Sequence, residues 1–214
     1  MQTLLIATHN AHKTREIAQM LGSTWEVREL SSLAHAPEIR EIGATFEENA
    51  AQKALTISRQ FHGLVLADDS GLEVDALGGA PGVHSARFAG PRATDEDNRL
   101  LLIKKLKELG GEEASARFRC VMVLASRGSM LGSFAGAVEG SVIPQERGHG
   151  GFGYDSMFIP NGYDQTFAQL APVKKNSLSH RARALRKVME FLRGRICRTP
   201  GSGAAEIGLD YHGG

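Results

Sequence analysis

Apolar positions along the chain follow two spacings, and each spacing predicts a different kind of element. Short apolar runs between polar residues predict buried strands, and alternation of apolar with charged residues predicts half-exposed ones. Two long alternating runs flank an Arg-Gly-Ser turn at 127–129 and predict a β-hairpin. The strands are therefore expected at 4–7, around 25–27, at 64–68, at 116–126 and at 130–143, with a further short strand or turn at 72–77.

Helical spacing of apolar residues separates these strands. Two of the helices begin at a threonine with an acid three residues later, Thr45 with Glu48 and Thr94 with Asp97, which is the pattern of a capping box. The helices are expected at 13–21, 45–61, 94–109 and 178–196. Because strands alternate with helices early and a hairpin comes late, we expect an α/β fold with a mixed twisted sheet and flanking helices.

Composition limits the classes of protein that this chain can be. Its 214 residues are 42% hydrophobic, enough for one domain over 1–197, and the small polar residues of 198–214 predict a disordered tail. The net charge of +1 argues against nucleic-acid and membrane partners. Cys120 and Cys197 lack metal-ligand spacing, so we expect a reducing, cytoplasmic setting, with Cys120 as a small core residue.

Two adjacent acids, Asp68 and Asp69, follow the apolar run 64–67. Ligands bind at the carboxyl ends of strands in α/β sheets, and two ionised acids there need a positive partner. A Mg²⁺ ion with a phosphorylated substrate is one such partner, whereas a polar turn that ends the strand is the alternative. Because neighbouring strand residues point to opposite faces, the two acids are expected to do different jobs.

Two further segments offer cations to a phosphate. Thr8 and Asn10 lie in a turn between a strand and a helix, and Lys13 follows one turn into that helix, which suits an anion. The alternative is that Asn10 only caps the helix and Lys13 is solvated. Lys53 shares a helix face with Asn49 and either points into a cleft or pairs with Asn49 at the surface.

The segment 148–155 combines four glycines with Phe152, Tyr154 and Asp155. Glycines allow close approach to a ligand, and aromatic rings stack on nucleobases; a tight hairpin loop with its aromatics in the core is the alternative. Because aromatics are only 6% of the chain, two of them in one glycine loop favour a base pocket.

Positive charge at the start of the last predicted helix is unusual. Ser179 is expected to cap this helix, which places His180 and Arg181 in its first turn, where positive charge opposes the helix dipole. An acidic partner or a ligand would offset that penalty. Arg181 can donate a fork of hydrogen bonds to a base carbonyl or to a phosphate.

Taken together, these segments resemble the inosine triphosphate pyrophosphatase family. One motif alone is weak, but six occur in the order in which the family has them. The matching segments are 8–13 (Thr-His-Asn-x-x-Lys), 45–54, 67–77 (beginning Ala-Asp-Asp-Ser-Gly), 81–90, 151–155 (Gly-Phe-Gly-Tyr-Asp) and 179–181 (Ser-His-Arg).

The resemblance implies a fold with two lobes around a cleft, a homodimer, and Mg²⁺-dependent hydrolysis of non-standard purine nucleoside triphosphates to monophosphate and pyrophosphate. Asp69 matches the acid that activates water and also lies at the metal, and Glu41 matches a second metal ligand. The residues that match substrate contacts are Thr8, His9, Asn10, Lys13, Lys53, Ser70, Phe152, Gly153, Tyr154, Asp155, Lys175, His180 and Arg181.

Three positions depart from the family pattern. His12 stands where many members have glycine, Ser156 replaces a frequent proline, and Gln169 stands where an acid is common, so no metal role is assigned to it. Two other functions are open. One is a related pyrophosphatase for modified pyrimidine or methylated nucleotides, and the other is a nucleotide-binding module without turnover.

Overall fold

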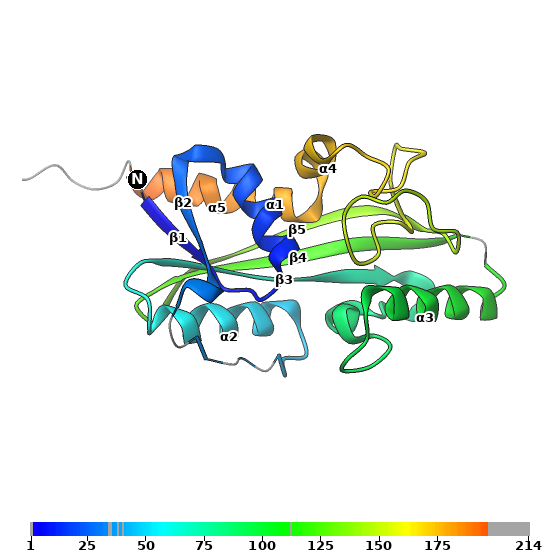
Figure 1. Cartoon of the computed structure of the whole chain (residues 1–214), viewed down its shortest axis with the longest axis horizontal. Helices are drawn as coiled ribbons and strands as arrows, with labels where there is room; N and C mark the ends of the chain where they lie inside the picture. Colours follow the sequence, from blue (N-terminus) through cyan, green and yellow to red (C-terminus); the bar gives the residue numbers. More distant parts are fainter. Residues whose placement is uncertain (1, 34–35, 38, 40, 112, 197–214) are drawn as a thin grey trace, which may run out of the picture.

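One mixed six-stranded sheet forms the centre of the protein, with helices on both faces (Figure 1). The computed structural model describes residues 2–33, 36–37, 39, 41–111 and 113–196. The strand order is β2-β1-β3-β4-β5-β6; β1 pairs in parallel with β2 and β3, and the other pairs are antiparallel. The predicted fold class is confirmed. The strands are β1 (Gln2–Ile6), β2 (Trp25–Glu29), β3 (Leu64–Val74), β4 (Ala114–Ser126), β5 (Ser129–Val142) and β6 (Phe158–Pro160).

The helices begin close to the residues that the capping signals predict. Thr94 and Asp97 form a complete capping box. At α2 the Thr45 side chain accepts from the Glu48 amide, but the Glu48 carboxylate accepts from the amide of Ala44 instead of Thr45. The helices are α1 (Ala11–Leu21), α2 (Phe46–Ser58), α3 (Asp95–Glu108), α4 (Pro172–Leu178) and α5 (His180–Ile196), of which α4 was not predicted. Single 3₁₀ turns are η1 (Gly22–Thr24), η2 (Leu30–Ser32), η3 (Asp75–Leu77) and η4 (Gly82–Arg87).

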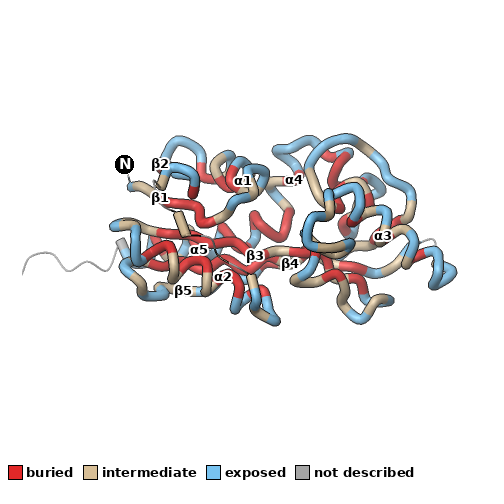
Figure 2. The backbone as a smooth tube through the Cα atoms, turned by 60° about the horizontal axis from the view of Figure 1, so that its bottom comes forward, coloured by how far each residue is buried: buried red, intermediate tan, exposed pale blue. Residues whose placement is uncertain are grey.

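The two faces of the sheet bury different sets of side chains. Leu4 and Ile6 pack with α1 and α5 on one face, whereas Leu5 and Ala7 pack with α2 on the other. A third cluster surrounds β6 and includes Leu102 of α3. Figure 2 shows the buried stretches running along the central strands. The period of two along each strand therefore decides which helix a strand residue meets.

The strand β3 is longer than predicted. It continues through Asp68 to Val74 because β4 pairs with it over its whole length, from Val65 to Val74. The prediction that the strand stops at Asp68 is wrong, and the first half of the separate element expected at 72–77 belongs to β3, whereas its second half is η3. On its other side β3 pairs with β1 only as far as Leu66. The edge beyond that residue, here called the free edge, has no neighbouring strand among the described residues, although Glu73 near its end forms an isolated bridge with Pro81.

A close backbone approach is built into this free edge at Gly71. A Cβ atom on this residue would lie 2.3 Å from the carbonyl oxygen of Gly82 and 2.4 Å from Ser85 Oγ. The Ser85 hydroxyl accepts from the Leu72 amide at 2.9 Å, which satisfies a donor of the free edge. Glycine at position 71 therefore lets η4 cover β3 without a collision.

Some predictions about organisation stay untested. A single domain over 1–197 and its division into two lobes remain predictions, and the tail 198–214 lies outside the described residues. Within the described ranges, no helix is both long and apolar enough to cross a membrane.

Candidate active site

A cavity of about 250 Å³ opens where β1 ends and the free edge of β3 begins. The structure brings together, around this one cavity, every residue that was predicted for the site, although their roles stay predictions. These residues are Thr8, His9, Asn10, Lys13, Glu41, Lys53, Asp69, Ser70, Phe152, Gly153, Tyr154, Asp155, Lys175, His180 and Arg181.

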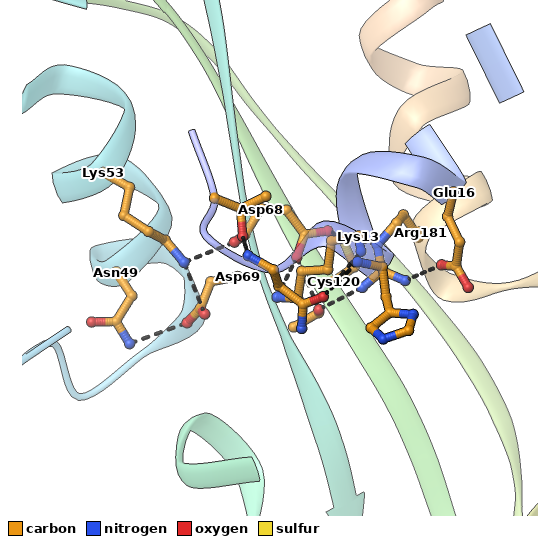
Figure 3. A network of polar contacts seen from close by, with 12 residues as sticks. Lys13, Glu16, Asn49, Lys53, Asp68, Asp69, Cys120 and Arg181 are labelled. Carbon is orange, nitrogen blue, oxygen red and sulfur yellow. Dashed lines mark hydrogen bonds and ion pairs between the residues drawn. The ribbon is translucent and has the colours of Figure 1, made fainter. Parts of the chain in front are cut away.

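The two acids of β3 point to opposite faces of the sheet, as their adjacency predicts (Figure 3). Asp68 is fully buried and accepts from Lys13 Nζ at 2.6 Å and from Arg181 Nε at 3.0 Å. Burial alone would raise the pKa of the Asp68 carboxyl, but Arg181 and Lys13 outweigh it and hold that pKa well below its usual value. Asp68 is therefore an ionised centre that joins the predicted phosphate turn to the last helix.

Cys120 takes part in the same cluster. Its side chain is buried in the core, as predicted, but its Sγ also lies 3.1 Å from Asp68 Oδ2 (Figure 3). Burial, and then the negative charge of Asp68, raise the pKa of this thiol well above its usual value. Cys120 is thus a protonated donor to Asp68, a role that its apolar surroundings in the sequence did not reveal.

Asp69 faces α2. It accepts from Asn49 Nδ2 at 3.1 Å and from Lys53 Nζ at 3.2 Å. Burial raises the pKa of the Asp69 carboxyl above its usual value, against the opposing pull of Lys53 and Lys13. A raised pKa makes this carboxylate a better proton acceptor than an exposed one, which suits a general base.

Lys53 is at the centre of the acidic end of the cavity. Its side chain is only 6% exposed, so the surface alternative is wrong. The ammonium donates to the Asp68 carbonyl oxygen at 2.7 Å and to Glu41 Oε1 at 3.0 Å, besides Asp69. Burial alone would lower the pKa of Lys53, but the negative charges of Asp69, Glu41 and Asp68 outweigh it and raise that pKa.

The same oxygens form a donor set that fits Mg²⁺. Glu41 Oε1 and Asp69 Oδ1 both face one positive centre, and carboxylate oxygens are the hard ligands that Mg²⁺ prefers. No group of three or more His, Cys, Asp or Glu side chains is placed for a metal in the described part of the chain. Two carboxylates suffice for Mg²⁺, because substrate phosphates and water commonly complete its shell.

The turn after β1 is organised by Asn10. Its side-chain oxygen accepts from the amides of His12 at 2.9 Å and Lys13 at 3.2 Å, so Asn10 caps α1. Asn10 also lines the cavity, and its contact with substrate stays a prediction. The solvated alternative for Lys13 is wrong, because its side chain is 13% exposed and pairs with Asp68. The turn thus presents Thr8 and His9 to the cavity with Lys13 directly behind them.

The opposite end of the cavity is held by a second buried acid. Asp155 Oδ2 accepts from the Phe152 amide at 2.9 Å and from Lys175 Nζ at 2.6 Å. Glu16 of α1 bridges Lys175, at 2.6 Å, and Arg181. Sequence reasoning missed Glu16, although its position one helical turn after Lys13 places both side chains on one face of α1.

The last helix is capped and charged as predicted. Ser179 Oγ accepts from the Ala182 amide at 3.2 Å, and the charge of Arg181 is offset by Asp68 and Glu16. His180 is buried and stacks on Phe118 at 4.8 Å. Burial, and then Arg181, hold the pKa of His180 well below its usual value, so this imidazole is neutral near pH 7. Its Nδ1 has no hydrogen-bond partner among the residues that the structure describes.

Residues of α3 hold the glycine-rich loop, and the sequence had no signal for this contact. Asp95 Oδ2 accepts from the Gly153 amide at 2.7 Å, and Arg99 donates to the Gly153 carbonyl at 3.1 Å. The Tyr154 hydroxyl donates to the Ser85 carbonyl at 2.8 Å. These partners lie more than 50 positions apart in the sequence, so only the fold brings them together.

Two of the three departures from the family pattern have local explanations. Ser156 Oγ donates to Glu146 at 2.8 Å. Gln169 accepts from the Thr166 amide at 3.0 Å within its own loop and does not line the cavity.

The site combines acids and lysines at one end of a single cavity with an aromatic loop at the other. Residues 4–191 match the Ham1 family, and the chain belongs to that family. It is 46% identical over 193 residues to a dITP/XTP pyrophosphatase of Bacillus licheniformis. The aligned residues cover 90% of this chain and 98% of that protein. A dITP/XTP pyrophosphatase of Bacillus subtilis is 42% identical over 193 residues, with the same shares.

Solved structures agree with the family assignment. A HAM1 protein from Coxiella burnetii superposes with a TM-score of 0.80 at 35% identity, covering 91% of this chain and 100% of that one. The Staphylococcus aureus Ham1 protein has a TM-score of 0.79 at 36% identity, with the same coverage. The predicted resemblance to a pyrophosphatase family and the prediction of an enzyme are confirmed by these relatives.

Proposed function

We propose that this protein is a Mg²⁺-dependent pyrophosphatase that converts inosine, deoxyinosine and xanthosine triphosphates to the monophosphate and pyrophosphate. The observation that supports this most directly is one cavity with two chemically different ends, one with acids around a lysine and one with an aromatic loop. Asp69, Glu41 and Lys53 meet at one end, and Phe152 with Asp155 forms the other. A reacting phosphate and a recognised base need such a pair of subsites in one cavity.

Lys13 and Lys53 are proposed to neutralise the triphosphate. Both ammonium groups are largely buried against acids in this structure, so they are already oriented toward the cavity. Positive groups in a water-poor site stabilise charge that develops on phosphate oxygens more than they would in water. The exposed turn at Thr8 and His9 then supplies short polar contacts at the start of α1.

Asp69 is proposed to accept the proton of the attacking water. Asn49 and Lys53 fix its two oxygens, so the carboxylate is held in one orientation before substrate binds. Its raised pKa increases its affinity for a proton relative to an exposed aspartate. Glu41 and Asp69 would hold the Mg²⁺ ion, which when bound supplies Lewis-acid polarisation of phosphate oxygens.

Base selectivity is proposed to arise from buried donors at the aromatic end. Lys175 and Arg181 are cations held by Asp155, Glu16 and Asp68, so they remain donors when a base enters. The 6-oxo group of a purine can accept hydrogen bonds from Lys175 and Arg181. The 6-amino group of adenine is itself a donor, so it would leave those two side chains without an acceptor.

A nucleotide panel tests this function. We expect pyrophosphate release from inosine, deoxyinosine and xanthosine triphosphates with kcat/KM about 10- to 100-fold above that for ATP, because an unpaired buried donor is costly. Release should require added Mg²⁺ and stop with a chelator. Equal kcat/KM for ATP and inosine triphosphate would contradict the selectivity.

The same panel separates the other functions. Preference for a modified pyrimidine or methylated nucleotide would indicate the related pyrophosphatase. Orthophosphate as product would indicate a phosphatase, and binding without product would indicate a nucleotide-binding module.

A homodimer and a cytoplasmic location are kept as proposals that rest on the family resemblance and on composition. Light scattering on the purified protein tests the first. We expect a mass twice that of one chain, and the mass of a single chain would contradict it.

A further inference from the structure

His12, which stands where many family members have glycine, contacts the loop proposed to bind the base. Its ring stacks on Phe152 with the centroids 5.1 Å apart and the planes inclined by 17°. The His12 side chain is exposed at the second position of α1, and its backbone amide is already bound to Asn10. The ring therefore connects the phosphate turn to the aromatic loop.

The Phe152 ring has neighbours of two kinds, the imidazole of His12 and two cations. Lys175 Nζ lies 5.1 Å and Arg181 Cζ 5.7 Å from the ring centroid, and both of these residues line the cavity with Phe152. His12 does not line the cavity. The imidazole therefore contacts Phe152 without being part of the cavity lining.

The backbone around Phe152 offers little lateral support for that ring. Gly151 and Gly153 flank it with φ of +74° and +59°, a region that glycine adopts freely. Asp155 fixes the Phe152 amide but does not fix the direction of the side chain. An aromatic neighbour on α1 adds a restraint to that of the two cations, because offset stacked rings attract each other beyond their shared burial.

We propose that His12 is a positioning residue that holds Phe152 in place as the stacking platform for the nucleobase. The proposal rests on the proposed function in that the cavity must bind a nucleotide, but it does not need the nucleotide to be hydrolysed. His12 would act only on the base end of the ligand, through Phe152, and leave the binding of the phosphates unchanged.

Calorimetry with two probes tests this on the full-length protein. One probe is the α,β-imido analogue of inosine triphosphate, which resists cleavage at that bond, and the other is inorganic tripolyphosphate, which has no base. We expect His12→Ala to bind the analogue roughly 2- to 12-fold more weakly, the range that an aromatic pair accounts for. Tripolyphosphate affinity should stay unchanged, which a general disturbance of the turn would not allow.

Two further variants complete the design. His12→Phe keeps a stacking ring and should restore the affinity for the analogue. Arg15→Ala removes another exposed side chain of α1 and should leave both affinities at the wild-type values. Both replacements for His12 keep the backbone amide that Asn10 caps.

Other outcomes would overturn the proposal. Unchanged binding in His12→Ala would show that the stack has no role, and tighter binding would show that the imidazole occupies the place of the base. Equal weakening of both probes, or failure of His12→Phe to restore binding, would remove stacking as the cause. A wild type that binds the analogue no better than tripolyphosphate would overturn it too. Tight binding of the analogue with no pyrophosphate release from inosine triphosphate itself would contradict only the proposed function.

Discussion

Replacing Asp69 with asparagine is expected to lower kcat by about 10²- to 10⁴-fold, the usual contribution of a general base. Asparagine has nearly the same size and keeps one oxygen that can accept from Asn49 or Lys53. The substitution therefore removes the proton acceptor while the surrounding contacts of the site remain. The binding of nucleotide should stay measurable, because Lys13 and the base pocket are untouched.

Pyrophosphate release and calorimetric binding, measured on the same preparation, check this expectation. Asp75→Asn is the matched control, since Asp75 is an exposed acid just after β3 that pairs with Arg117 of β4 and does not line the cavity. Turnover near the wild-type rate in Asp69→Asn would contradict the assignment of Asp69. Loss of binding together with turnover would mean that Asp69 acts in substrate affinity rather than in proton transfer.

Replacing Asp68 with asparagine is expected to lower the free energy of unfolding by about 3–5 kcal/mol, the usual effect of breaking a buried ion pair. Asp68 is fully buried and is the partner of Lys13, Arg181, Ser70 and Cys120. Without its charge, the cations of Lys13 and Arg181 lose the negative group that offsets their burial. Those same cations hold the pKa of Asp68 low in the folded protein. An acid whose pKa is lower in the folded than in the unfolded state stabilises the fold when it is ionised.

Urea denaturation followed by circular dichroism measures this loss. Asp75→Asn serves again as control, because its carboxylate is 48% exposed and pairs at the surface, where a pair contributes less than about 1 kcal/mol. A loss in Asp68→Asn no larger than that of the control would contradict the view that Asp68 is the stabilising centre of the site.

Local signals accounted for most of the elements and for the residues that line the cavity at the predicted site. Thr94 with Asp97 marked the start of α3, and the alternating runs marked the β4–β5 hairpin. The adjacency of Asp68 and Asp69 was enough to predict that they face opposite sides of the sheet. Each of the six motifs of the resemblance contributes at least one residue to the lining of one cavity.

The errors came from features that depend on distant partners. The polar residues after Leu66 looked like the end of a strand, but β4 pairs along them and extends β3 to Val74. Lys53 looked equally suited to the surface, yet three oxygens from two other segments draw it inward. Glu16 and Asp95 had no recognisable motif, because the partners that give them a role lie elsewhere in the chain.

The sequence by itself therefore determined the fold class, the helix starts, the opposite orientations of the two adjacent acids and the family to which the chain belongs. These follow from spacing over a few residues and from short motifs. Only the tertiary structure decided which acid pairs with which base, as for Asp68 and Arg181, which lie 113 positions apart. The reason is physical: a buried ion pair depends on distance and burial, and both are set by how the sheet and helices pack.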